Sequence, residues 1–402
     1  MLKILLLQQH YYPEMAGVAR RAKELSEQFV KNGHSVTVFT TYPRDFRSMP
    51  GFIINKYEVL NKVLVFRRKT IFSVGENTIF RMLSYLVYVI QCFIFISKNK
   101  NKFDILISMA PLPPAIASAL ANKFYKIHHH FDVPDILPDL GISAGMIKNK
   151  FVIYMLYKLE KWVYHYSNSI SPITHGQINN IINKGVPKEK LTYIPDWIDD
   201  TFFRENLSKY KNKVSENLVY PNKKLITFVG NIGALQNPEI FLNTMMALAE
   251  ENHNEFLFLF IGDGIMLTHL KEKTSEFNLN NVIFIGRVKR EYIPAYMNLS
   301  DILVANYLPN EYMDICIPGK LFEYAISKKP IIMGSKGEAK TLIEKYSLGK
   351  AVQPSDVNAF KEAIIQFSNG SIKFEPKTEN FVKDFSLQEI SKLYNNILKQ
   401  VN

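Results

Sequence analysis

The chain has 402 residues, a hydrophobic share of 47% and a formal net charge of +12 at pH 7. That length is too great for one hydrophobic core, so two domains are expected. Residues 1–199 hold 25 Lys and Arg against 14 Asp and Glu, an excess of +11, whereas the remainder is nearly neutral. No nucleic-acid-binding pattern accompanies this charge, which favours an anionic membrane surface or a phosphate-bearing lipid as partner.

The cysteine content and the N-terminal sequence indicate the cytoplasm. Cys92 and Cys316 are far apart and lack metal-type spacing, which argues against a disulfide framework and is typical of a reducing compartment. Met1–Leu7 is too short an apolar run for a signal peptide. We therefore expect a cytoplasmic protein, and the basic first half favours a peripheral position on the inner face of a membrane.

The first elements predict a doubly wound α/β domain. An apolar strand at Lys3–Gln8 is followed by a loop containing Gly17, an amphipathic helix over Val18–Asn32 and a strand at Ser35–Thr40. The dinucleotide fingerprint is absent, because one glycine stands where three are needed. Gly17 would let the backbone approach a ligand, although a tight turn explains it equally well.

Ile79–Ser97 is the most apolar stretch, with Arg81 as its one charge. Its length is borderline for a bilayer span of about 20 residues. A span would place consecutive strands on opposite sides of a membrane, because Asp104–Ser108 resumes the sheet. We therefore predict a buried or interfacial helix.

The strand Lys126–Phe131 contains three consecutive histidines. Consecutive side chains on a strand alternate between its faces, so these three cannot hold one metal ion. Asp132, Asp135 and Asp139 follow at the carboxyl end of this strand, where open α/β sheets bind ligands. Capping of the next helix is the alternative.

The middle of the chain predicts a domain boundary. A helix over Phe151–Tyr166 carries lysines, tyrosines and a tryptophan that suit a membrane-facing surface. Phe203–Pro221 lacks periodicity and is assigned to the linker. The domains are thus predicted at 1–200 and 201–384, and the C-terminal helix within 385–402 could pack back on the first domain.

The second half repeats strands that end in glycine turns. The strand Leu225–Val229 is followed by Gly230–Gly233, Glu255–Ile261 by Gly262–Gly264, and Val282–Ile285 by a turn containing Gly286, Arg287 and Val288. Turns at the carboxyl ends of parallel strands share one edge of the sheet. Together with Arg287 and Lys320, they predict a cleft for a nucleotide diphosphate.

Ile317–Glu323 predicts a loop that turns at Pro318 into a short helix carrying Lys320 and Glu323. First helical turns favour acidic residues, so Lys320 is expected to face an anion such as a diphosphate. Glu323 could then reach a sugar or ribose hydroxyl. An ordinary surface helix is the alternative.

In their order and spacing, seven motifs resemble those of the retaining GT-B glycosyltransferases of the GT4 type, over nearly the whole chain. Within them the chain resembles bacterial O-antigen and capsule enzymes, including the L-fucosamine-transferring subgroup. The motifs are Tyr11–Arg20, Asn32–Val38, Asp132–Asp139, Ile194–Asp199, Val229–Gln236, Gly262–Gly264 and Ile317–Glu323.

This resemblance implies two facing Rossmann-like domains. The second would hold a UDP-type nucleotide-sugar donor, and the first a lipid-linked saccharide acceptor. Transfer would proceed with retention and without a metal or other cofactor. The catalytic candidates are Asp132, near the reacting sugar, with Lys320 and Glu323.

The resemblance also implies a set of donor-binding positions. Gly17 would approach the donor diphosphate, Val288 would border the base and Glu323 would hold the ribose. The full set of donor-binding candidates is Gly17, Asn231, Gly233, Gln236, Gly262, Gly264, Arg287, Val288, Pro318, Lys320 and Glu323.

Three positions depart from the family pattern. Ile315 stands where a second glutamate is usual, and Asn231 and Gln236 stand where an Arg and a Lys commonly grip the diphosphate. We therefore expect Lys320 to take over the cationic role, with Arg287 as a second candidate.

The function predicted from the sequence is transfer of a sugar, expected to be an N-acetylated deoxyhexosamine, to a polyprenyl-diphosphate-linked saccharide in O-antigen or capsule synthesis. Two alternatives remain open. His130 and Asp132 keep open a UDP-N-acetylhexosamine epimerase of the same fold. Ile315 keeps open a non-catalytic, membrane-bound sugar-nucleotide-binding subunit.

Overall fold

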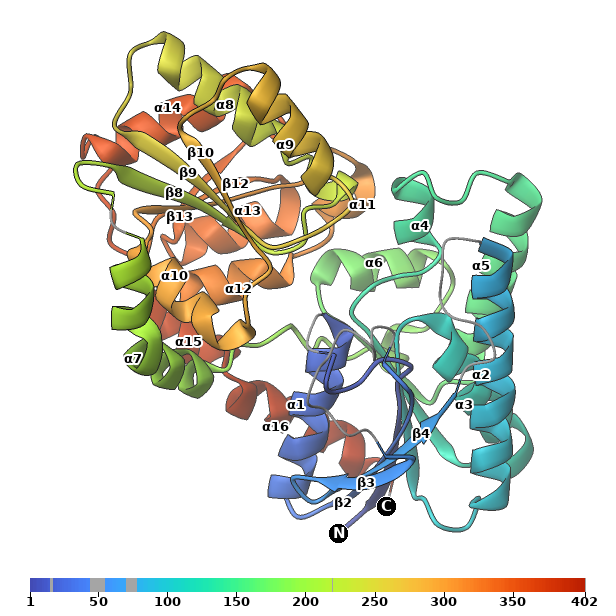
Figure 1. The fold of residues 1–402 in the computed structure, drawn as a ribbon. Coiled ribbons are helices and arrows are strands. Elements are labelled where there is room, and N and C mark those ends of the chain that lie inside the picture. Colours follow the sequence, from blue (N-terminus) through green and yellow to red (C-terminus); the bar gives the residue numbers. More distant parts are fainter. Residues whose placement is uncertain (15–16, 44–54, 70–77, 219, 402) are drawn as a thin grey trace. The chain divides into compact units, whose positions relative to one another are not determined.

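The computed structural model describes residues 1–14, 17–43, 55–69, 78–218 and 220–401 (Figure 1). The chain divides into two compact units, which we treat separately. The first unit comprises Met1–Asp196 together with Leu387–Asn402, and the second comprises Trp197–Ser386. Cys92 lies in the first unit and Cys316 in the second, and both are buried free thiols.

The first unit is built on a seven-stranded sheet in the order β3-β4-β2-β1-β5-β6-β7. All neighbouring strands are parallel except β3 and β4, which are antiparallel. Parallel strands covered on both faces are expected to be continuously apolar, as β1 and β5 are. The strands are β1 (Lys3–Leu7), β2 (Ser35–Thr41), β3 (Tyr57–Leu60), β4 (Val63–Arg68), β5 (Ile105–Met109), β6 (His128–Val133) and β7 (Ser169–Pro172).

Helices cover both faces of this sheet. On one face, α1 (Val18–Lys31) packs against α16 (Leu387–Lys399), with Phe29 edge-to-face against Tyr394 at 5.6 Å between ring centroids. α16 thus belongs to the first unit, a placement that the sequence had left open. The opposite face is covered by α2 (Thr78–Lys98), α3 (Leu112–Tyr125) and α5 (Lys150–His165). Two shorter helices, α4 (Asp139–Ser143) and α6 (His175–Asn183), complete the unit.

The apolar stretch that the sequence singled out forms α2. Its Tyr88, Cys92 and Ile96 are fully buried in a core shared with Leu5 of β1 and Leu106 of β5. Among the residues that the structure describes, no helix is both long and apolar enough to cross a membrane. α2 therefore has one side in the core, as predicted for a buried or interfacial helix.

The second unit contains a six-stranded, wholly parallel sheet in the order β10-β9-β8-β11-β12-β13. The chain runs outward from β8 to β10 and then returns to start in the other direction at β11. The carboxyl ends of β8 and β11 therefore form a topological switch point, where such sheets bind ligands. The strands are β8 (Lys224–Val229), β9 (Phe256–Ile261), β10 (Val282–Gly286), β11 (Ile302–Asn306), β12 (Ile331–Gly334) and β13 (Gly349–Val352).

The predicted linker is wrong, because α7 (Asp200–Asn217) occupies most of it. Asp199 caps this helix by accepting a hydrogen bond from Phe202 N at 2.9 Å. Tyr210 and Val214, one turn apart, pack with Ala295 and its neighbours. Only this narrow apolar row is buried among many Lys and Asn residues, which is why periodicity was not apparent.

The other helices of the second unit surround its sheet (Figure 1). They are α8 (Glu239–Glu250), α9 (Leu267–Glu276), α10 (Ile293–Leu299), α11 (Glu311–Asp314), α12 (Gly319–Ala325), α13 (Gly337–Lys345), α14 (Val357–Ser368) and α15 (Thr378–Phe385). Single-turn 3-10 segments also occur there, η3 (Ala234–Gln236) being the one next to the switch point.

Candidate functional site

Two glycine turns pack backbone against backbone at the switch point of the second unit. A Cβ on Gly262 would lie 1.9 Å from the carbonyl oxygen of Gly230, and a Cβ on Gly264 would lie 2.3 Å from that of Ile232. Both glycines also have positive φ, at +142° and +158°. Close contact between these loops therefore requires Gly262 and Gly264. Their predicted contact with a donor stays a prediction.

Lys320 on α12 places a cation beside the first of these turns. Its Nζ lies 3.9 Å from the Phe228 ring centroid and 5.8 Å from that of Tyr307, at the ends of β8 and β11. A Cβ on Gly230 would be 3.3 Å from the same atom. The residue as a whole is half-buried, but its Nζ is buried and has no hydrogen-bond partner among the described residues.

Burying an unpaired ammonium group destabilises the folded protein unless a partner compensates its charge. Burial lowers the pKa of Lys320 to about 7, and the nearby carboxylate of Glu323 opposes that shift only in part. The faces of the two aromatic rings offset some of the lost hydration. An anion at the Gly230 turn would restore the missing partner, so this position is suited to a diphosphate.

Tyr324 fixes α12 against the sheet, a role that no sequence pattern indicated. Its hydroxyl accepts a hydrogen bond from Val229 N at 2.8 Å. The same hydroxyl lies 3.2 Å and 3.3 Å from the carbonyl oxygens of Val229 and Val304, to either of which it can donate. The helix that carries Lys320 is thereby tied to both strands of the switch point.

Two amide side chains converge over Gly233. A Cβ there would lie 2.6 Å from Asn231 Nδ2 and 2.8 Å from Gln236 Oε1. Gln236 Oε1 is buried and lacks a hydrogen-bond partner among the described residues. Asn306 holds this segment by donating to Gln236 O at 3.2 Å. Where the family pattern has cations, this chain thus presents neutral amides next to a buried lysine.

The remaining candidates in the second unit follow β10 or lie at α12. Arg287 is exposed and follows β10, two strands from β8, a separation of about 10 Å. Val288 is half-buried beside it. Glu323 is half-buried one turn along α12, and Pro318 is the N-cap residue of that helix. The structure therefore groups Lys320 with Glu323 and the Gly230 turn, and separates Arg287 from them.

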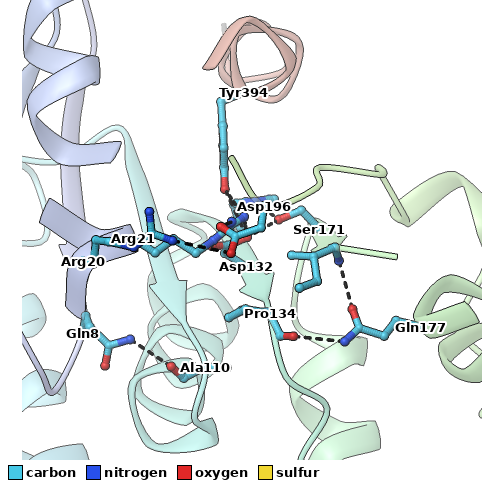
Figure 2. Close-up of polar contacts among 12 residues, drawn as sticks. Gln8, Arg20, Arg21, Ala110, Asp132, Pro134, Ser171, Gln177, Asp196 and Tyr394 are labelled. Carbon is cyan, nitrogen blue, oxygen red and sulfur yellow. Dashed lines mark hydrogen bonds and ion pairs between the residues drawn. The ribbon is translucent and has the colours of Figure 1, made fainter. Parts of the chain in front are cut away.

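In the first unit, Asp132 on β6 is the centre of a buried ionic network (Figure 2). Arg21 grips its carboxylate with two hydrogen bonds, from Nε at 2.8 Å and from Nη2 at 3.1 Å. Ser171 and Tyr394 donate to Asp132 Oδ1 at 2.8 Å and 3.1 Å. Arg21 also reaches Asp196 Oδ1 at 3.2 Å. β6, β7, α1 and α16 meet in this network.

The surroundings of Asp132 favour its ionised form. The side chain is fully buried, and both carboxylate oxygens accept hydrogen bonds from the protein. Burial would raise the pKa of Asp132, but the Arg21 guanidinium and the hydroxyl donors outweigh it and hold the pKa below its usual value. The structure thus shows Asp132 holding Arg21, Ser171 and Tyr394 together inside the first unit, while its place near the reacting sugar stays a prediction.

His130 belongs to the same buried region. Its Nε2 lies 3.0 Å from Ser171 Oγ and its Nδ1 lies 2.9 Å from Ser169 Oγ. Burial lowers its pKa to about 4, so it is neutral at physiological pH. Both residues that kept an epimerase open are thus engaged inside the unit. No group of three or more metal-ligating side chains suited to a metal ion occurs in the described ranges.

Asp135 is a strand-end carboxylate to which the sequence assigned no separate role. It follows β6, and burial raises its pKa to about 6, with a further contribution from Asp196. Gly17 lies at the start of α1 with φ +52°, and a Cβ there would meet no atom of the described residues within 4 Å. Its positive φ is a backbone conformation that favours glycine, and its contact with a donor stays a prediction.

Two family profiles together match most of the chain. The profile described as Glycosyltransferase Family 4 matches residues 15–202, and the one described as Glycosyl transferases group 1 matches residues 223–369. The structural neighbours have the GT-B fold of two Rossmann-like domains with parallel sheets, which confirms the predicted fold class. The protein is therefore a glycosyltransferase of the GT4 type, with one domain from each family.

Curated relatives extend over much the same length. WcaI of Escherichia coli (strain K12), provisionally named a colanic acid biosynthesis glycosyl transferase, is 23% identical over 99% of this chain and 98% of its own. WbjE of Pseudomonas aeruginosa, provisionally named a glycosyltransferase, is 21% identical over 76% of this chain and 78% of its own.

Solved structures share the fold at lower identity. Anabaena Alr3699/HepE in complex with UDP and glucose has a TM-score of 0.73 at 14% identity, covering 100% of both chains. WaaG, a glycosyltransferase involved in lipopolysaccharide biosynthesis, has a TM-score of 0.67 at 14% identity, covering 99% of both. UDP-GlcNAc 2-epimerase from Methanocaldococcus jannaschii has a TM-score of 0.61 at 14% identity, again covering 99% of both, so the fold alone does not separate transferase from epimerase.

Proposed function

We propose that the protein transfers a sugar from a UDP-sugar to a polyprenyl-diphosphate-linked saccharide, with retention, in O-antigen or capsule synthesis. The sugar is an N-acetylated deoxyhexosamine in this proposal. The observation that carries it is Lys320 Nζ, which is buried without a hydrogen-bond partner among the described residues, beside the Gly230 turn at the switch point. A donor diphosphate supplies the anion that this site lacks.

The chemistry assigns a role to each group around Lys320. An acceptor hydroxyl oxygen attacks C1 of the donor sugar from the face that the diphosphate leaves, and the bond from C1 to the phosphate oxygen breaks. The hydroxyl proton passes to the departing phosphate. Lys320 stabilises the negative charge that develops on that phosphate, and it does so from a helix already fixed by Tyr324. The amides of Asn231 and Gln236 offer neutral hydrogen bonds near the same turn.

Three of the similar proteins support the donor and the pathway. The HepE structure is a complex with UDP and glucose, WcaI is provisionally named for colanic acid biosynthesis, and WaaG is involved in lipopolysaccharide biosynthesis. The excess of +11 in residues 1–199 supports a lipid-linked, anionic acceptor and a position on the cytoplasmic face of the membrane.

The test is a donor screen that measures nucleoside diphosphate release from a panel of nucleotide sugars, with and without a lipid extract. Release that requires both one UDP-sugar and the lipid fraction is the expected result. Lys320→Met should abolish it, whereas Lys328→Met should not, because Lys328 is 62% exposed and pairs with Glu379 at the surface.

Two other outcomes would contradict the proposal. Conversion of a UDP-sugar without lipid would identify an epimerase. Binding of UDP without turnover on any donor would favour a non-catalytic subunit, and Ile315 would then be the first position to replace with glutamate.

A further inference from the structure

Helix α2 leaves a regular apolar row exposed on its outer side. Met82, Leu86, Ile90 and Ile94 follow one another at intervals of four residues and are 57%, 56%, 49% and 48% exposed. Tyr88, Cys92 and Ile96, each two residues further along, lie on the opposite side of the helix and are fully buried. A helix that is apolar on its outer side as well as its inner side exposes a surface that water does not favour.

Helix α5 has a second exposed apolar segment at its beginning. Phe151 is 72% exposed, Tyr154 is 53% exposed and Met155 is 49% exposed. α5 and α2 cover the same face of the sheet with α3 between them, and α3 contacts both helices. Their outer sides therefore belong to one surface of the first unit, which we call the α2–α5 surface. It is defined by Met82, Leu86, Ile90, Ile94, Phe151 and Met155.

The exposed charges described on these three helices have one sign. Among the described side chains, the exposed charged residues of α2, α3 and α5 are Lys98, Lys123, Lys150, Lys158 and Lys161. The one acidic residue on these helices, Glu160, is buried and paired with Lys184 at 2.9 Å. Lys158 Nζ also lies 4.8 Å from the ring centroid of Tyr154. Apolar and aromatic side chains bordered by lysines are typical of helices that lie in a membrane interface.

We propose that the α2–α5 surface docks on an anionic phospholipid bilayer, with its apolar side chains at the level of the headgroups and its lysines on the lipid phosphates. The charge pattern favours this occupant over a second copy of the chain. A two-fold dimer would place the same surface against itself, so lysines would meet lysines. The biological reason for docking, access to a lipid-linked acceptor, rests on the proposed function, whereas binding to lipid does not require it.

The first experiment is sedimentation of the full chain with vesicles, in the absence of UDP. Vesicles that contain phosphatidylcholine and phosphatidylglycerol should bind the protein, and added salt should weaken binding. Leu86→Gln with Ile90→Gln should lower the vesicle affinity at least about tenfold, because both substitutions remove apolar surface that would be transferred from water into the bilayer. Lys158→Glu with Lys161→Glu should lower it by about tenfold or more on anionic vesicles only.

Matched controls come from the second unit. Phe277→Gln replaces an apolar side chain that is 41% exposed, and Lys340→Glu with Lys345→Glu reverses two charges on α13. These variants should bind vesicles like the unaltered chain. Unchanged thermal unfolding of every variant shows that a loss of binding is not a loss of folding.

Failure of the unaltered chain to bind anionic vesicles, or binding by both α2–α5 variants at full affinity, would overturn the proposal. So would light scattering that finds a dimer which Leu86→Gln with Ile90→Gln dissociates, because a second copy would then occupy the surface. UDP binding without vesicle binding would reject the docking proposal and leave the donor site intact. Vesicle binding without UDP binding would reject the donor site and leave docking intact.

Discussion

At the scale of single residues, Lys320 destabilises the ligand-free protein, and in the proposed function it binds the donor diphosphate. Its ammonium is buried without a hydrogen-bond partner in the described part of the chain, and burial lowers its pKa to about 7. A buried, unpaired cation lowers the stability of the ligand-free protein, and natural binding sites commonly retain such costs. The same property prepares the site for an anion.

We expect Lys320→Met to raise the free energy of unfolding at pH 7 by about 2 kcal/mol while removing UDP binding, since a similar apolar volume replaces a desolvated charge. Thermal unfolding and isothermal titration with UDP measure the two effects. The Lys328→Met variant is the control for both. A Lys320→Met protein that binds UDP normally would remove Lys320 from the donor site.

The pH dependence of UDP affinity should follow from the same group. In the free protein the pKa of Lys320 is about 7, so the protonated form that attracts an anion declines as the pH rises above that value. Affinity should therefore fall between pH 7 and 9, approaching tenfold per pH unit at most. Lys320→Met should show no such fall. A flat profile for the unaltered chain would contradict a titrating lysine in the site.

Asp132 shows the opposite situation, a buried charge whose partners are complete. We expect Asp132→Asn to cost about 3–5 kcal/mol of stability, because Arg21 would keep a buried charge without its partner. Ser171→Ala should cost about 1 kcal/mol, the loss of one hydrogen bond. Chemical denaturation measures both. Glu375→Gln, at a pair whose acid is 71% exposed, should change stability by less than about 0.5 kcal/mol.

The direction of the Asp132 pKa shift determines whether the stability of the protein rises or falls as the pH is lowered. Its pKa is lower in the folded protein than its usual value, so the ion pair contributes stability above that usual value. The contribution is lost as the pH falls toward and through the folded pKa. Asp132→Asn should therefore flatten the decline in stability below about pH 4. If the stability of Asp132→Asn declined in acid as steeply as that of the unaltered chain, Asp132 would not be the group responsible for this decline.

At the scale of elements, Tyr324 connects α12 to β8 and β11 through one hydroxyl. We expect Tyr324→Phe to lower UDP affinity several-fold, with a stability loss of about 1–3 kcal/mol for the buried backbone groups left unpaired. Tyr346→Phe, which removes a hydroxyl that bonds Asp384 at 2.5 Å on the second unit, should leave UDP affinity unchanged. Equal affinity in Tyr324→Phe would show that α12 needs no such tether to present Lys320.

The elements differ in how well they could be predicted, and the reason is physical. β1, β5, β8 and β9 are continuous apolar runs, which is the pattern of parallel strands buried on both faces. α7 was missed because one narrow row of apolar residues packs on α10. Strand ends were predicted within a few residues, so the glycine turns were assigned to the correct edge.

The candidate site was predicted less completely than the fold. Lys320 was found because a cation in a first helical turn needs an explanation. The partners of Asp132 were not, since Arg21 is 111 positions away and Tyr394 is 262 positions away. Nothing in the local sequence indicates that these side chains meet. Similarly, the sequence predicted that Gly262 and Gly264 contact a ligand. The structure shows a contact between two loops, and this contact requires glycine at both positions.

At the scale of the whole molecule, the second unit is inserted between two segments of the first. We expect residues 197–386 to fold and to bind UDP when produced alone, because the β8–β13 sheet and Lys320 lie within them. Residues 1–196 should be markedly less stable than the same segment supplied with a peptide of residues 387–401, which restores Tyr394. Circular dichroism and denaturation test both fragments. A fully stable segment 1–196 would show that α16 adds little.

The return of α16 to the first unit has a consequence during synthesis. The ribosome adds about 200 residues between Asp196 and the end of α16. At about 5–20 residues per second, this takes about 10–40 s. Throughout that interval the nascent first unit has its sheet but not the tyrosine that completes the Asp132 network, and the α1 side chain Phe29 is uncovered. The chain thus passes through a period in which the first unit lacks one of the helices that cover its sheet.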